Sequence, residues 1–313
     1  MDVLSDLLDR ARAGHAQVRQ LIQRPPWALT FVDAPGLTLV ATLGGEASIT
    51  RDGPPVPLAA GDLALISGPA RYTIADDPAT PPQVVIEAGR KQLLAGGGAA
   101  QQPIAPRTWG DGLPGATTML RGAYQVHGDA GERLLGMLPP LTVVPAGPRT
   151  RAALALLTAE AGRDEPGQDA VLHRLLDLLL VLALRAWCAG PSAPAWHRAL
   201  ADPIIGESLR LLHGDPARRW TVADLATSTG LSRAAFAARF TRLVGRPPLA
   251  YLTGWRMTLA ADLLRDTDAT IAAVARTVGY DDAFAFSTAF KRARGHTPST
   301  WRATLGTAAE SSL

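Results

Sequence analysis

The chain has 313 residues, of which 47% are hydrophobic and 19% charged, and its formal net charge is +3 at pH 7. At roughly 150 residues per domain, this length predicts two domains with cores of their own, and the composition excludes a disordered chain. The single cysteine, Cys188, excludes a disulfide framework and a cysteine-built zinc site, and it fits a reducing compartment. The N-terminus lacks the apolar segment of a secretory signal, and the apolar run 178–184 is too short to cross a bilayer. We therefore expect a cytoplasmic protein without a membrane partner.

Residues 1–148 are predicted to form a β-rich domain. The chain opens with helical spacing of apolar residues over 3–23. From Trp27 onward, short runs rich in β-branched residues are separated by glycine, proline and aspartate, and 56–67 is predicted as strand, tight turn and strand. Residues 91–115 are rich in glycine and proline, so we expect a loop before strand character resumes. Strands at this spacing, without helices between them, predict a β-barrel or jelly roll.

Residues 149–200 change to helical spacing, with helices expected at 151–157 and 171–187. The second helix is apolar on almost every face, so it must be buried on more than one side. Pairing with the same helix of a second copy, through Leu179 and Leu182, would bury the surplus in a homodimer, which is our expectation. The alternative is that this helix is the core of a monomeric helical layer.

The last hundred residues contain two similar segments, 221–240 and 270–290, which begin 49 residues apart. Each has a short amphipathic helix, a glycine, a polar helix cap and a second helix with two phenylalanines. A helix-turn-helix unit needs a glycine where the turn requires positive φ and a capped second helix held by large apolar groups. The residues that carry the pattern are Gly230 and Gly279 in the turns, Ser232 and Asp281 as caps, and Phe236, Phe240, Phe286 and Phe290 on the inner faces.

Together with the connecting helix at 248–265, these segments resemble the AraC/XylS family of bacterial transcription regulators over residues 203–304. The likeness includes Gly245-Arg246-Pro247-Pro248, Tyr251-Leu252, Trp255-Arg256, Ala260, Leu263-Leu264, Ile271, Val274-Ala275, Gly279-Tyr280, Phe286, Phe290-Lys291, Gly295-His296-Thr297-Pro298 and Trp301-Arg302. The resemblance implies a sequence-specific regulator with double-stranded DNA and RNA polymerase as partners. We expect an activator, with a repressor as the alternative. The N-terminal part is similar to the cupin-type sensor of one subgroup, which implies a small-molecule effector of unknown identity.

The expected fold is therefore a two-domain α+β chain. A cupin-like β-barrel or jelly roll at 1–148 is followed by a helical dimerisation segment at 149–200 and an all-α domain with two helix-turn-helix motifs at 203–304. Residues 203–305 carry 14 basic and 8 acidic residues, a net charge of +6, whereas residues 1–202 have a net charge of −2. A basic excess confined to the last domain is consistent with a polyanionic partner.

The resemblance places one recognition helix in each motif. Expected DNA contacts in the first are Ser232, Arg233, Ala234, Ala237, Ala238, Arg239 and Arg242, and in the second Asp282, Ala283, Phe284, Ala285, Thr288, Lys291 and Arg292. The basic residues are expected at phosphates, and the small ones close to base edges. The alternative for the first helix is a plain alanine-rich surface. Phe284 either packs against a neighbouring helix or touches a thymine methyl group, and Asp282 is expected to face solvent or a basic side chain.

The remaining candidates concern ligands and catalysis. Trp27, Thr42, Tyr72 and Glu87 are candidate ligand contacts inside the barrel, or else ordinary core and surface residues. No histidine lies in 37–43 or near Tyr72, where the resemblance would imply metal ligands, and no two histidines have ligand spacing. We therefore predict no metal, no cofactor and no catalytic residue, and we expect Cys188 to be a buried hydrophobe. A cupin-fold enzyme with an accessory helical domain is the alternative function; a DNA-repair regulator with a thiol-rich acceptor domain is excluded by the single cysteine.

Overall fold

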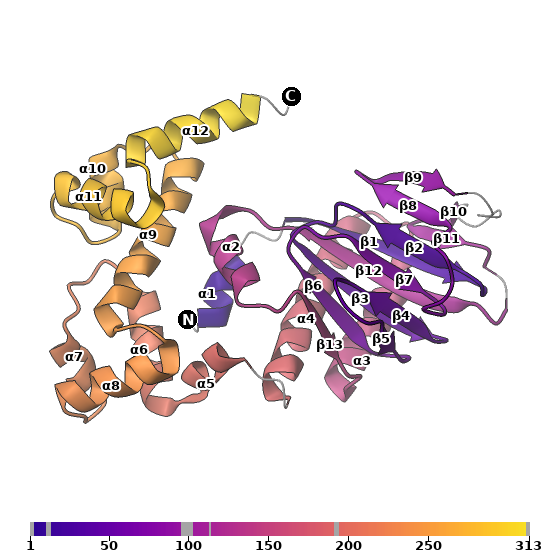
Figure 1. The fold of residues 1–313 in the computed structure, drawn as a ribbon, viewed down its shortest axis with the longest axis horizontal. Coiled ribbons are helices and arrows are strands. Elements are labelled where there is room, and N and C mark those ends of the chain that lie inside the picture. The colour runs from indigo at the N-terminus through magenta and orange to yellow at the C-terminus, as the bar shows by residue number, and fades with distance from the viewer. Residues whose placement is uncertain (1–2, 11–13, 95–102, 113, 191–193, 311–313) are drawn as a thin grey trace. The chain divides into compact units, whose positions relative to one another are not determined.

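A computed structural model describes residues 3–10, 14–94, 103–112, 114–190 and 194–310 (Figure 1). The chain divides into two compact units. The β unit comprises Ala13–Val126 and Leu135–Ser192, and the helical unit comprises Met1–Arg12, His127–Leu134 and Ala193–Leu313. The helical unit therefore contains two short segments from the N-terminal part of the chain, which the sequence did not indicate.

The described residues of the β unit form two sheets (Figure 1). The first has seven strands in the order β10-β11-β1-β12-β3-β6-β13, and the second has six in the order β5-β4-β7-β2-β8-β9. The strands are β1 (Gly14–Gln23), β2 (Ala28–Phe31), β3 (Leu37–Gly44), β4 (Ala47–Thr50), β5 (Val56–Leu58), β6 (Leu63–Ser67), β7 (Tyr72–Ala75), β8 (Val84–Glu87), β9 (Arg90–Leu93), β10 (Pro103–Ala105), β11 (Thr108–Gly110), β12 (Thr117–Gln125) and β13 (Leu141–Val144). Apolar side chains of both sheets, such as Leu29, Val40 and Ile74, form one core, so the predicted β-rich domain is confirmed.

Two local predictions in this unit were wrong. The helix expected over 3–23 ends early: α1 covers Val3–Arg10, and residues from Gly14 onward form β1, which pairs with both β11 and β12. Hydrogen bonds to two neighbouring strands outweigh the local helical spacing. The described part of 91–115 contains β10, β11 and most of β9 rather than a loop, whereas residues 95–102 and 113 lie outside the described residues. All of β9 and β10 is exposed, which is why their composition resembles that of a loop.

The two helices predicted in the segment 149–200 are present as α3 (Pro148–Ala161) and α4 (Gln168–Ala189). They pack on each other, and Leu176 of α4 fits against Gly122 of β12, where a β-carbon would lie 2.5 Å from the leucine Cδ1. Leu179 is completely buried within the β unit, so it was wrongly expected at a dimer interface. The large apolar side chains left exposed on these helices are Leu156, Val171 and Leu178.

The helical unit has the predicted succession of short helices (Figure 1). They are α5 (Ala195–Ala201), α6 (Pro203–Gly214), α7 (Val222–Thr227), α8 (Arg233–Val244), α9 (Pro248–Asp266), α10 (Ile271–Thr277), α11 (Ala283–Arg294) and α12 (Pro298–Glu310). The first part of α2 (Gly128–Gly136) and α1 join them. No helix in the described residues is both long and apolar enough to cross a membrane.

Candidate functional site

The first helix-turn-helix unit consists of α7 and α8. Thr221 and Asp224 cap α7 reciprocally, since each side chain accepts a hydrogen bond from the backbone amide of the other at 2.9–3.1 Å. Gly230 in the turn has φ +70°, in the left-handed region that glycine enters at little cost. The Ser232 hydroxyl accepts a hydrogen bond from the Ala235 amide at 3.3 Å, so it caps α8 as predicted. These contacts fix where α8 begins and which way it faces.

The outer face of α8 matches the predicted stripe. Phe236 and Phe240 are completely buried, so the positions opposite them point away from the unit. The exposed residues of this face are Arg233, Ala234, Ala238, Thr241 and Arg242, and Ala237 is half-buried. The structure therefore brings these candidates together on one open surface.

Arg239 differs from the other candidates on α8. Its Nη2 lies 2.7 Å from Oδ2 of Asp202, the residue that also caps α6 by accepting from the Ile204 and Ile205 amides. Burial raises the pKa of Asp202, but the hydrogen bonds from Arg239 and the two amides outweigh it, and the net pKa is lowered. The charge of Arg239 is thus already matched within the protein, where it holds α8 to α6.

The second unit, α10 and α11, repeats the plan of the first with one correction. Gly279 has φ +85° in the turn, and Thr270 caps α10 by accepting from the Ala273 amide at 3.2 Å. The cap of α11 is Asp282, not Asp281 as predicted, because it directly precedes the first residue of the helix. Its carboxylate accepts from the Phe284 and Ala285 amides at 3.1 and 2.9 Å. Asp281 forms an ion pair with Arg219 instead.

The outer face of α11 resolves the alternatives for Phe284. This side chain is 79% exposed, so it does not pack against a neighbouring helix of the chain. The other exposed candidates are Asp282, Ala285, Thr288, Lys291 and Arg292, and Ala283 is half-buried. Phe286 and Phe290 are completely buried, as predicted. Phe284 and the small residues beside it are therefore open to solvent on the same helix as Lys291 and Arg292.

The two outer faces also share an unbalanced positive charge. Arg233 and Arg242 on α8, and Lys291 and Arg292 on α11, are exposed. Within the part of the chain that the structure describes, no ion pair to a carboxylate is formed by any of these four side chains. Arg233 attracts the exposed Asp224 and helps to lower its pKa, but exposed cations that form no ion pair remain available to an external anion.

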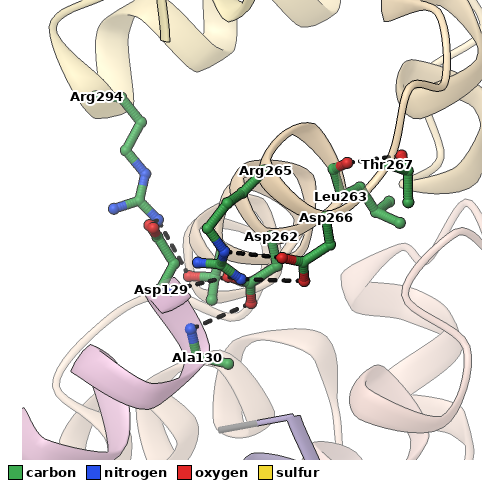
Figure 2. A network of polar contacts seen from close by, with 9 residues as sticks. Asp129, Ala130, Asp262, Leu263, Arg265, Asp266, Thr267 and Arg294 are labelled. Carbon is green, nitrogen blue, oxygen red and sulfur yellow. Dashed lines mark hydrogen bonds and ion pairs between the residues drawn. The ribbon is translucent and has the colours of Figure 1, made fainter. Parts of the chain in front are cut away.

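The central helix α9 is anchored by segments that the sequence did not connect to it (Figure 2). Asp262 accepts hydrogen bonds from the Asp129 and Ala130 amides at 2.8 and 3.2 Å, so it caps α2 from another element. Arg265 donates to Asp262 at 2.8 Å, and Arg294 at the end of α11 forms an ion pair with Asp129. Burial raises the pKa of Asp129 to about 6 despite the attraction of Arg294.

A second buried contact joins α1 to the same unit. The His213 ring shares hydrogen bonds with Asp6 Oδ2 at 2.8 Å and with the Tyr251 hydroxyl at 2.7 Å, and it stacks on Trp255. Asp6 lies 207 residues from His213 in the chain. No periodicity in the sequence marks such a pair, which is why the sequence analysis assigned neither residue a role.

The β unit contains a pocket of about 540 Å³, and one of the four ligand candidates lies in its lining. Trp27 lines this pocket, but Thr42, Tyr72 and Glu87 do not. Thr42 and Tyr72 are buried in the unit, and Glu87 lines a neighbouring hollow. The lining residues that the sequence analysis missed include Arg19, Lys91, Trp109 and Arg121. Lys91 and Trp109 fall in the stretch expected to be a loop, and Arg19 in the stretch expected to be helical.

Metal ligation and thiol chemistry find little support in the described residues. No group of three or more histidine, cysteine, aspartate or glutamate side chains there is arranged to hold a metal ion. Cys188 is buried, and desolvation raises the pKa of its thiol to about 11, so it holds its proton near neutral pH. The absence of a metal and of a cofactor stays a prediction.

Comparisons with known proteins match both units. Residues 2–189 match a family model described as a cupin, and residues 225–304 match one described as a helix-turn-helix domain. A Streptomyces lividans protein described as an AraC-like transcription regulator is 35% identical over 311 residues, or 96% of this chain and 98% of that relative. The HTH-type transcriptional regulator AlkR of Acinetobacter baylyi is 29% identical over 96% of this chain and 99% of its own length. Among solved structures, the C-terminal domain of AraT from Geobacillus stearothermophilus is similar to part of this chain. The match covers 33% of this chain and 86% of that domain at 31% identity, with a TM-score of 0.32.

Proposed function

The chain belongs to the family of AraC-like transcription regulators, and we propose that it reads DNA through the outer faces of α8 and α11. The observation that carries this proposal is the pair of capped helices whose exposed faces combine small side chains with unpaired cations. A helix presented in this way fits the major groove, which is wide enough to admit it. Two such helices joined by α9 would enter successive grooves about one turn of DNA apart.

The exposed residues divide into two roles. Arg233, Arg242, Lys291 and Arg292 suit phosphate contacts, because long cationic side chains at the edges of the stripes reach the backbone on either side of a groove. Ala238 on α8 allows close approach to a base edge and can pack on a thymine methyl group. Phe284 suits the same apolar contact on α11, since it is exposed.

We place the protein in the cytoplasm. We also propose that it forms a homodimer whose interface includes α4. The exposed Val171 and Leu178 on this helix alternate with the half-buried Leu175 and Leu182. Their spacing of four, three and four residues is that of a coiled-coil seam. A second copy that paired along this seam would cover both exposed side chains and place two DNA-binding units on repeated half-sites.

The β unit would hold a small-molecule effector, and the bound regulator would act as an activator through RNA polymerase. The support for a sensor is its cupin-type fold and its pocket, which has the size of a small-molecule site. No observation favours the enzyme alternative.

Matched variants of the full chain test the two roles on DNA. Arg233→Ala should weaken binding to all sequences to a similar extent and lower its salt dependence, because a phosphate contact carries no sequence information. Ala238→Gln should instead change the preferred bases, at about 1–3 kcal/mol for each lost contact. The controls are Arg71→Ala, an exposed arginine of the β unit that is not on α4, and Ala250→Gln on the exposed side of α9. An unchanged base preference for Ala238→Gln in a selection from random DNA would show that α8 does not read bases.

A further inference from the structure

The pocket of the β unit has an apolar interior that opens between the two sheets. Its apolar lining comes from both sheets and includes Leu29 and Ile74 from one and Val40 and Met119 from the other. Three aromatic rings add to this wall, those of Trp27, Phe31 and Trp109. At about 540 Å³, the space is within the range of small-molecule sites.

Three cations belong to the lining of this apolar space. Arg19 of β1 lies directly opposite Arg121 of β12 in the antiparallel register. Like charges in directly opposed positions destabilise a strand pair, so folding alone gives no reason for this arrangement. Lys91 of β9 reaches the same place, because its Nζ and the Arg19 guanidinium both lie 4.9 Å from the centre of the Trp109 ring. The Arg121 guanidinium lies 4.5 Å from the centre of the Phe31 ring and donates a hydrogen bond to the Tyr72 hydroxyl at 2.8 Å.

No carboxylate lies in the lining of this pocket beside the three cations, and the nearby Asp169, which attracts Arg19, is already paired with Arg107. The pocket lining contains no aspartate or glutamate, and neither Arg19, Lys91 nor Arg121 forms an ion pair there. Asp169 on α4 pairs with Arg107 at 2.7 Å, and Asp33 accepts a hydrogen bond from the Ala88 amide at 2.7 Å.

The crowding of positive charge changes the pKa values of Arg19 and Lys91. Burial lowers the pKa of Arg19, and repulsion from Arg121 and Arg107 lowers it further, against a smaller attraction from Asp169. Burial and repulsion from Arg19 likewise lower the pKa of Lys91. A bound anion would relieve this repulsion, because an opposite charge at close range favours the charged form of each side chain.

We propose that this pocket binds an organic anion with an apolar body. Its carboxylate or sulfonate would lie between Arg19, Arg121 and Lys91, and its body would pack against the aromatic and aliphatic wall. Arginine beside an aromatic ring favours this mode, since it presents several donors to an anion while its flat face covers apolar surface. The site rests on the geometry of the β unit; only its role as the effector site rests on the proposed function.

Two fluorescent probes of similar shape and different charge test the proposal on the full chain. 1-Anilinonaphthalene-8-sulfonate is an apolar anion, and N-phenyl-1-naphthylamine has the same rings without the sulfonate. We expect the sulfonate probe to bind more tightly, and Arg19→Gln or Lys91→Gln to weaken it about tenfold. The neutral probe should change by less than about twofold, because the wall is intact in these variants. Arg19→Lys should restore part of the affinity for the sulfonate probe.

The matched controls are Arg71→Gln, an exposed arginine outside the lining, and Arg90→Gln, the neighbour of Lys91 that lines a different hollow. Neither should affect either probe. Equal loss of affinity for both probes, or no preference for the sulfonate probe in the wild-type protein, would overturn the proposal.

A second measurement tests the effector role. The wild-type protein and its variants, with and without the sulfonate probe, are titrated onto operator DNA. If the sulfonate probe binds as expected but leaves DNA affinity unchanged, the pocket stands and its effector role fails. If the probe does not bind while DNA recognition persists, the pocket proposal fails alone.

Discussion

The two turn glycines occupy equivalent places in the helix-turn-helix units, and the structure predicts very different costs for replacing them. Both have positive φ, +70° at Gly230 and +85° at Gly279. A β-carbon at Gly230 would meet no atom within 4 Å, whereas one at Gly279 would lie 2.4 Å from the carbonyl oxygen of Ala217. That oxygen belongs to a backbone segment held by Arg256, whose Nε donates to the Pro216 carbonyl at 2.7 Å.

Gly230→Ala should therefore destabilise its unit only by the left-handed penalty, about 1–2 kcal/mol. Gly279→Ala should cost the same penalty plus the displacement of a fixed backbone segment, together more than about 3 kcal/mol. Hydrogen exchange followed by mass spectrometry reports the opening free energy of each segment separately, which suits a chain with two units. Equal losses in the two variants, or a Gly279→Ala protein within about 1 kcal/mol of wild type, would refute the reasoning.

Three further predictions follow from burial and exposure. Asp129 has a pKa of about 6 in the folded state against 3.8 ordinarily. Between these two pH values its carboxyl is protonated in the folded chain and ionised in the unfolded chain, so the free energy of unfolding falls as pH rises from 3.8 to 6. Asp129→Asn removes this slope, so its stability relative to wild type, from urea unfolding, should increase by up to about 3 kcal/mol between pH 4 and pH 7; a constant difference would contradict the raised pKa. With a thiol pKa of about 11, Cys188 should react with iodoacetamide at pH 8 at least about a hundredfold more slowly in the folded than in the unfolded chain, and equal rates would contradict its burial. Leu178→Lys should give the mass of one chain by light scattering, while Ala159→Lys, an exposed position on α3 rather than on the α4 seam, remains a dimer; a dimeric Leu178→Lys protein would place the interface elsewhere.

The sequence predicted best what depends on neighbouring residues. The helix-turn-helix units follow from caps, turn glycines and buried phenylalanines within about twenty residues of one another, and the structure departs from this pattern only at the cap of α11. Asp281 and Asp282 are adjacent, so the sequence alone does not show which of them α11 follows.

Features built from distant residues could not be predicted in the same way. β1 has helical spacing in its sequence, and its strand conformation depends on pairing with β12 about a hundred residues later. The facing pair of Arg19 and Arg121 requires that register, and the contact between Asp129 and Asp262 requires a fold that brings together residues 133 apart. Local patterns do not encode such contacts, because they arise from packing of the complete chain.

The most direct test of the account is a footprint of the full-length protein on an operator selected from random DNA. The account predicts that the helical unit of each protein chain protects two stretches of DNA, about one turn apart. Binding is also expected to weaken steeply as salt rises. It also predicts that Ala238→Gln changes base preference in one stretch and that Thr288→Gln changes it in the other. Protection of a single groove, or both variants changing the same base pairs, would contradict the claim that α8 and α11 read successive grooves.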